Sequence, residues 1–113
     1  MAETVTPIRD TRLVVLDGAG GGSVQFGPGR PNTRWVITGV SVMTSTNTLE
    51  ARGDLYRGGE LVSSTFTASS GDSDNELPPY PLWPGEVYRF VWTGGDAGAS
   101  ATLAFRGEEI TGM

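Results

Sequence analysis

The chain has 113 residues, a net charge of −5 and neither Cys nor His, and all eight of its basic residues are Arg. Without His, Cys and Lys there can be no Ser–His or Cys–His nucleophile system, no Schiff base and no lysine of a phosphate-binding loop, and zinc lacks its usual ligands. The acidic charge disfavours nucleic acids and anionic membranes, so we expect a non-enzymatic protein with no cofactor, no metal, no nucleic-acid partner and no membrane partner.

Short β-branched and aromatic runs, separated by Gly, Pro, Asn and Asp, recur along the chain and predict strands. The polar residues 1–11 are predicted to form an N-terminal arm, followed by a single domain over residues 12–113. The strands predicted in this domain span residues 12–17, 23–26, 33–43, 49–57, 60–68, 86–93 and 99–106. Such closely spaced short strands predict an all-β fold, an antiparallel β-sandwich or jelly roll of about seven to eight strands.

Several local signals refine this prediction. Gly39 lies where the apolar alternation of its strand changes parity, which predicts a bulge, and Gly58-Gly59 predicts a hairpin turn. Residues 69–85 hold four prolines, which exclude a central strand, and the tail from residue 107 is polar. Period-two alternation places Tyr88, Phe90 and Trp92 on one face, which favours a core over an exposed sugar platform.

The glycine-rich segment 94–98 (GGDAG) raises the question of whether it binds phosphate. A phosphate-binding loop needs a Lys and a following helix, whereas residues 99–105 alternate as a strand does. We therefore predict a hairpin loop joining strands 86–93 and 99–106.

Two segments carry a family resemblance. They are LWPGEVYRFVWTGGDAGASATLAFRGEE (residues 82–109) and GPGRPNTRWVITGVSVMTST (residues 27–46). Their PGE turn, WTGGD segment and Trp-containing strand resemble small β-proteins encoded among the virion genes of actinobacterial tailed phages. The resemblance covers residues 26–109 and implies a non-enzymatic virion component.

This resemblance implies an accessory structural protein, made in the host cytoplasm and located in the virion. The expected role is decoration of the capsid exterior by a homo-oligomer that docks on major capsid or tail proteins. The alternative is a minor tail or tail-tip protein that contacts host surface saccharide.

Docking residues are predicted in two places. Residues 77–84 (LPPYPLWP) are apolar, aromatic and stiffened by proline, which favours either a docking loop or a crossover lying over the end of the sandwich. The predicted contact residues are Pro79, Tyr80, Leu82 and Trp83 of this segment, with Pro7, Ile8 and Arg9 of the arm. The alternating acids of residues 71–76 indicate a solvated acidic loop or a weak Ca²⁺ site.

Overall fold

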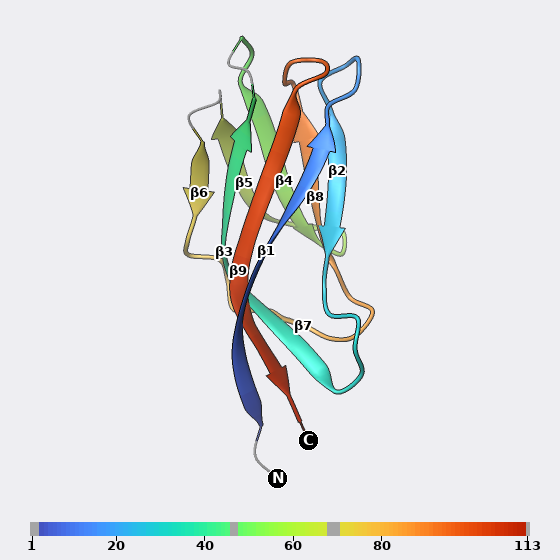
Figure 1. The fold of residues 1–113 in the computed structure, drawn as a ribbon, viewed down its shortest axis with the longest axis vertical. Helices are drawn as coiled ribbons and strands as arrows, with labels where there is room; N and C mark the ends of the chain where they lie inside the picture. Colours follow the sequence, from blue (N-terminus) through green and yellow to red (C-terminus); the bar gives the residue numbers. More distant parts are fainter. Residues whose placement is uncertain (1–2, 46–47, 68–70, 113) are drawn as a thin grey trace.

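A computed structural model of the chain describes residues 3–45, 48–67 and 71–112 (Figure 1). Nine strands lie in this part of the chain: β1 (Thr4–Val15), β2 (Gly22–Phe26), β3 (Thr33–Thr44), β4 (Ala51–Arg57), β5 (Glu60–Thr67), β6 (Asp72–Asp74), β7 (Pro81–Leu82), β8 (Tyr88–Thr93) and β9 (Ser100–Thr111). No helix, and hence no helix able to cross a bilayer, occurs in the described ranges. The predicted segments 1–11, 60–68 and 69–85 lie partly outside these ranges.

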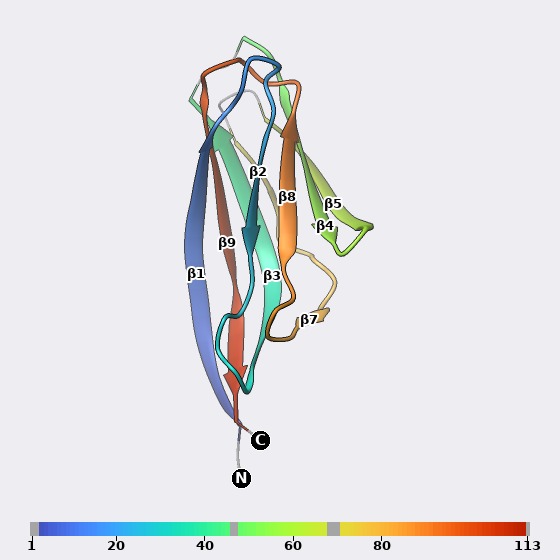
Figure 2. The same ribbon diagram turned by 90° about the vertical axis from the view of Figure 1, so that its right-hand side faces the viewer.

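The strands form two antiparallel sheets that face each other, which confirms the predicted β-sandwich (Figure 2). Sheet A has the order β1-β9-β3-β6, and β7 also pairs with β3. Sheet B has the order β2-β8-β4-β5. The molecule is elongated along the strands, with extents of 53 × 22 × 20 Å.

Alternating aromatic side chains of β8 fill the space between the sheets. Tyr88, Phe90 and Trp92 are each at most 1% exposed. Across the sandwich, Phe105 of β9 stacks on Phe26 of β2 with ring centroids 4.1 Å apart. These rings form the core, as their spacing predicts, because period-two residues of one strand share a face.

The predicted bulge at Gly39 is present in β3. The register against β9 shifts between Ile37 and Gly39. Ile37, Val40 and Val42 are consequently all buried, although they differ in parity. The bulge keeps both halves of this long strand facing the core.

The prediction of an arm over residues 1–11 is wrong from Thr4 onward. β1 pairs with β9 in an unbroken register from Thr4 opposite Thr111 to Val15 opposite Ser100, so the polar tail is also part of a strand. β1 is an edge strand, and most of its side chains are exposed. Residues 4–11 are held in the sheet by backbone hydrogen bonds, which any side chain allows. Their sequence therefore shows no hydrophobic alternation that would predict a strand.

The predicted hairpin between β8 and β9 is also wrong, because these strands lie in different sheets. Segment 94–98 is a crossover at one end of the sandwich (Figure 1). Both strands carry apolar faces, and these pack against each other across the sandwich rather than side by side. The Gly58-Gly59 hairpin, by contrast, is confirmed, with Arg57 opposite Glu60.

Residues 69–85, where the prolines exclude a central strand, contain two short strands at the edge of sheet A. β6 pairs with β3 at Val40–Val42, and β7 pairs with β3 at Trp35 and Val36. Both strands lie along the edge of β3 opposite to β9. An edge position tolerates proline, because the missing N–H is not needed by a further strand.

β5 directs a polar row inward and an aromatic ring outward. Ser63, Thr65 and Thr67 are buried, whereas Phe66 is 48% exposed. The buried hydroxyls are hydrogen bonded: Ser63 Oγ donates to an Asp74 carboxylate oxygen, and Thr65 Oγ1 donates to the Gly53 carbonyl. These bonds satisfy polar groups that burial would otherwise destabilise.

Candidate docking surface

The segment 77–84, here called the proline loop, is tied to the body of the protein at two apolar anchors. Leu77 is 7% exposed and Leu82 is fully buried in the core. Leu82 lies opposite Trp35 in the β7–β3 pair, and the Leu77 amide donates to the Thr38 carbonyl at 3.4 Å. The loop is therefore held against the edge of sheet A.

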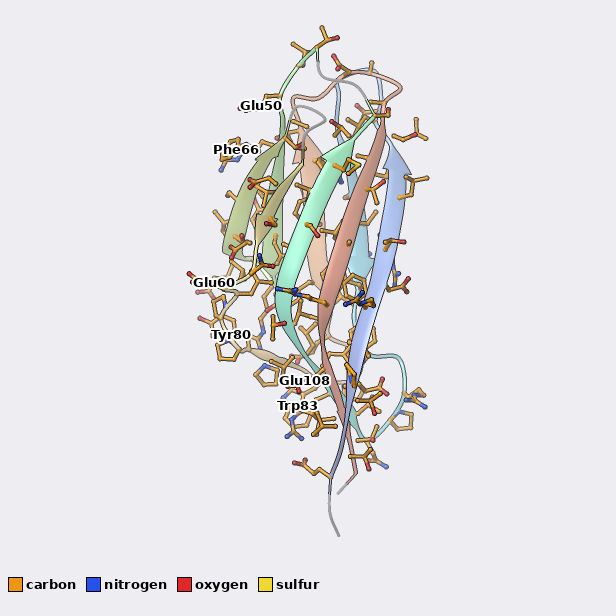
Figure 3. The ribbon with its side chains drawn as sticks, turned by 60° about the vertical axis from the view of Figure 1, so that its left-hand side comes forward. Glu50, Glu60, Phe66, Tyr80, Trp83 and Glu108 are labelled. Atoms are coloured by element: carbon orange, nitrogen blue, oxygen red, sulfur yellow. The ribbon has the colours of Figure 1, made fainter. Side chains whose placement is uncertain are left out.

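Between and after these anchors, two aromatic rings point into solvent. Tyr80 is 42% exposed and Trp83 is 50% exposed. Figure 3 shows both on the same side of the molecule, with Phe66 further along that side. We call Tyr80, Trp83 and the exposed Pro79 the docking surface.

Each of the two rings lies beside a guanidinium group. The Arg57 Cζ atom is 5.1 Å from the Tyr80 ring centroid, and Arg57 Nη2 donates to the Pro81 carbonyl at 3.1 Å. The Arg34 Cζ atom is 5.5 Å from the Trp83 ring centroid, and Arg34 also forms a salt bridge with Glu3. These cation–π contacts restrain the rings without burying them.

A tight turn follows Trp83. The Trp83 amide donates to Glu86 Oε1 at 2.8 Å, and the Glu86 amide donates to the Trp83 carbonyl at 2.9 Å. Gly85 has a φ of 89°, a value that side chains other than glycine rarely adopt. The turn fixes the backbone from which the Trp83 ring projects.

The structure corrects one predicted docking residue and relocates three others. Leu82 cannot meet a partner, because it is 0% exposed. Pro7, Ile8 and Arg9 lie within β1, where Pro7 and Arg9 are exposed and Ile8 packs partly against the core. Their position in an edge strand, rather than in a free arm, follows from pairing with β9.

The two predicted groups lie on one sheet but at opposite edges. The register across β1, β9, β3 and β7 places four residues in one row: Pro7, Glu108, Val36 and Pro81. Three strand spacings separate Pro7 from Pro81, about 14 Å. The groups thus flank the same end of sheet A without touching.

Arg57 is a part of this surface that sequence reasoning missed. It ends the alternating strand β4 and reaches the proline loop through Pro81 and Tyr80. Residues 57 and 80 are far apart in the chain, and no local pattern indicates their contact.

The polar groups of the glycine-rich segment 94–98 form hydrogen bonds with other loops of the protein. The Gly95 amide donates to the Gly20 carbonyl at 3.0 Å, and the Gly98 amide donates to the Leu16 carbonyl at 2.9 Å. Asp96 accepts hydrogen bonds from the amides of Thr48 and Leu49. The loop amides and the carboxylate therefore join loops of the fold rather than forming a cradle.

The alternating acids of residues 71–76 include two side chains, Asp72 and Asp74, that accept hydrogen bonds from β5. Asp72 accepts from the Phe66 amide at 2.9 Å, and Asp74 accepts from Ser63. These bonds link β6 of sheet A to β5 of sheet B. Within the described ranges, no group of three or more acidic side chains is placed to hold a metal ion.

Comparisons with known proteins leave the family open. No family model matches the chain, and no curated protein matches it significantly. Among solved structures, the crystal structure of FlhE matches with a TM-score of 0.44 and 15% identity, over 95% of this chain and 98% of that one.

Proposed function

We propose that this chain is a non-enzymatic structural protein of a tailed-phage virion, which decorates the capsid exterior as a homo-oligomer. The docking surface and the neighbouring face of sheet A bind adjacent virion proteins. The resemblance of residues 26–109 to small virion β-proteins supports the setting, and the exposed rings of the docking surface support the role.

The observation that carries this proposal is the exposure of Tyr80 and Trp83 on a restrained backbone. Aromatic and Arg side chains dominate the energetics of protein interfaces. The buried Leu82 and the contacts of Arg34 and Arg57 order this segment before any partner arrives. Little conformational entropy is then lost on docking.

The copy number of the protein in purified virions tests the setting. Quantitative mass spectrometry, normalised to the major capsid protein, is expected to give one copy per few capsid subunits. A handful of copies per particle would assign the protein to the tail, and its absence from particles would overturn the proposal.

Binding of variants to particles that lack the protein tests the surface. Trp83→Ala and Tyr80→Ala are expected to weaken binding by at least about tenfold each, as hot-spot aromatics do. Phe66→Ala is the matched control, because Phe66 is similarly exposed and lies beside Arg52 on sheet B. Equal losses in all three variants, or none, would contradict a docking role for the proline loop.

The alternative is a tail-tip protein that contacts host saccharide through the same two rings. Tyr80 and Trp83 are exposed with charged neighbours, as a sugar platform requires. A glycan array with wild-type protein and Trp83→Ala separates the roles. Binding of a host glycan that Trp83→Ala abolishes favours the tail, and no glycan binding favours decoration.

A further inference from the structure

The outer face of sheet A places two guanidinium groups side by side. Arg9 of β1 and Arg106 of β9 are direct partners in the antiparallel register. Their Cβ atoms are therefore about 5 Å apart, and like charges so placed destabilise a sheet. The pair points to a role in binding, since it does not favour folding.

Both arginines line an open pocket of about 470 Å³ that lies over the bulge in β3. On the outer face, Ala104 contributes a methyl group, and its register partners Thr11 and Ser41 contribute hydroxyl groups. We call this site the arginine pocket.

The bulge glycine makes room for one of the guanidinium groups. A Cβ atom at Gly39 would lie 2.9 Å from Arg106 Nε. Arg106 Nη2 also donates to Asn75 Oδ1 at 2.7 Å, which orients the group with a neutral partner. The fold thus positions Arg106 without neutralising it.

The positive charge of the arginine pocket is not neutralised within the described ranges. Neither Arg9 nor Arg106 forms a salt bridge with a described residue. Asp10, the one acid that lines the pocket in this part of the chain, is paired with Arg12 at 2.8 Å and accepts from the Thr11 amide. Two guanidinium groups without an acidic partner among the described residues, in a protein of net charge −5, form a local site for an anion.

We propose that the arginine pocket binds a carboxylate side chain from an acidic segment of a protein partner, an inference that rests on the proposed docking function. Planar guanidinium groups match the geometry of a carboxylate, and the two hydroxyl groups can donate further hydrogen bonds. The Ala104 methyl group offers apolar contact to the methylene groups that carry the carboxylate.

The surroundings favour a protein over a polyanion such as nucleic acid. The net negative charge of the chain opposes the approach of many phosphates. Next to the pocket, the partners Leu13, Thr102 and Met43 form a row without charge across three strands. Leu13 is 64% exposed and Met43 is 57% exposed, so this row offers apolar contact to a protein surface.

Peptide titration of the full chain tests the proposal. The blocked peptides Ac-Leu-Glu-Ala-NH2 and Ac-Leu-Gln-Ala-NH2 are added at constant ionic strength, and the Arg Nε–H resonances are followed by NMR. The Glu peptide is expected to shift the Arg9 and Arg106 resonances saturably, with at least about tenfold higher affinity than the Gln peptide. Equal affinity for both peptides would overturn the proposal.

Charge-removing variants locate the site. Arg9→Gln and Arg106→Gln are each expected to weaken Glu-peptide binding by at least about tenfold. Arg89→Gln is the matched control, because its register partners, Gln25 and Tyr56, carry no positive charge. The thermal midpoint of Arg9→Gln should not fall, since this variant removes a like-charge contact, whereas Arg106→Gln also loses the hydrogen bond to Asn75.

An equal loss in Arg89→Gln would indicate unspecific attraction and contradict the proposal. Tighter binding of inorganic phosphate or of an eight-residue thymidine oligonucleotide than of the Glu peptide would also contradict it. Virions that retain Arg9→Gln and Arg106→Gln at wild-type level would refute this site while the virion role stands. Glu-peptide binding by a protein absent from virions would refute the virion role alone.

Discussion

The two ends of the sandwich contain loops rich in special residues but use them in opposite ways. At one end, the glycine loops 18–22 and 94–98 bond to each other, and the Gly20 carbonyl accepts from the Gly95 amide. At the other end, the proline loop buries Leu82 and exposes Tyr80 and Trp83. Loops whose polar groups are already paired serve the fold, whereas loops that present side chains are available to partners.

Rigidity has a different physical origin at each end. The glycine loops approach so closely that a Cβ at Gly20 would lie 1.9 Å from the Gly95 carbonyl oxygen. The proline loop is ordered by apolar anchors and by prolines that fix φ. The difference can be tested by comparing a substitution at a buried or closely packed residue of each loop with a substitution at an exposed residue.

The largest change in stability is expected in the proline loop, where two adjacent residues should differ sharply. Leu82→Ala removes a fully buried side chain and should lower the free energy of unfolding by about 2–5 kcal/mol. Trp83→Ala removes a half-exposed ring and should lower it by less than about 1 kcal/mol. Urea unfolding measures both values, and similar losses would contradict the division into anchor and contact residue.

A comparable loss is expected in the glycine loops. Gly20→Ala introduces a clash with Gly95 at a φ of 77°, and should lower the free energy of unfolding by about 2–4 kcal/mol. Gly18→Ala is the control, because its Cβ would meet no atom within 4 Å. If urea unfolding gave the same midpoint for both variants, close packing of the two loops would not stabilise this end.

A smaller change, this time an increase in stability, is expected at a buried residue beneath the proline loop. The Tyr88 hydroxyl is buried without a hydrogen-bond partner among the described residues, so Tyr88→Phe should stabilise the protein by about 1 kcal/mol. Burial raises the pKa of Tyr88 above 10.0, with Arg57 opposing the shift. As the pH rises past 10, the unfolded chain ionises first, and wild-type stability should fall.

Thermal unfolding from pH 8 to 11 checks the Tyr88 prediction. Tyr88→Phe should lose less stability over this range than the wild type. Parallel pH profiles of the two proteins would show that the buried Tyr88 hydroxyl does not contribute to the loss of stability at high pH.

The smallest change in stability is expected at acid pH, from a carboxylate in the glycine loops. Hydrogen bonds from the amides of Gly21 and Ala19 lower the pKa of Asp17 below 3.8. A lowered pKa in the folded state gives stability that is present above pH 3.8 and is lost as the pH falls through the lowered value. Asp17→Asn should flatten this acid dependence in thermal unfolding, whereas an unchanged slope would exclude Asp17 as a contributor.

Local patterns predicted those features whose cause is local. The alternation of Tyr88, Phe90 and Trp92 predicts a buried face, and the parity change at Gly39 predicts the bulge. The aromatic and proline content of the proline loop indicates a contact segment. Within that loop, however, composition does not distinguish the buried Leu82 from the exposed Trp83.

The chain by itself determined an all-β sandwich and its core strands, because hydrophobic periodicity and turn residues act over a few positions. Tertiary structure alone decided that β8 and β9 lie in different sheets, that residues 4–11 pair with the C-terminal strand, and that Arg9 faces Arg106. Those outcomes depend on backbone hydrogen bonds and packing between residues distant in the chain. A periodic pattern shows that a segment is a strand with one buried face, but it does not show which distant strand lies beside it, so no local pattern could specify these pairings.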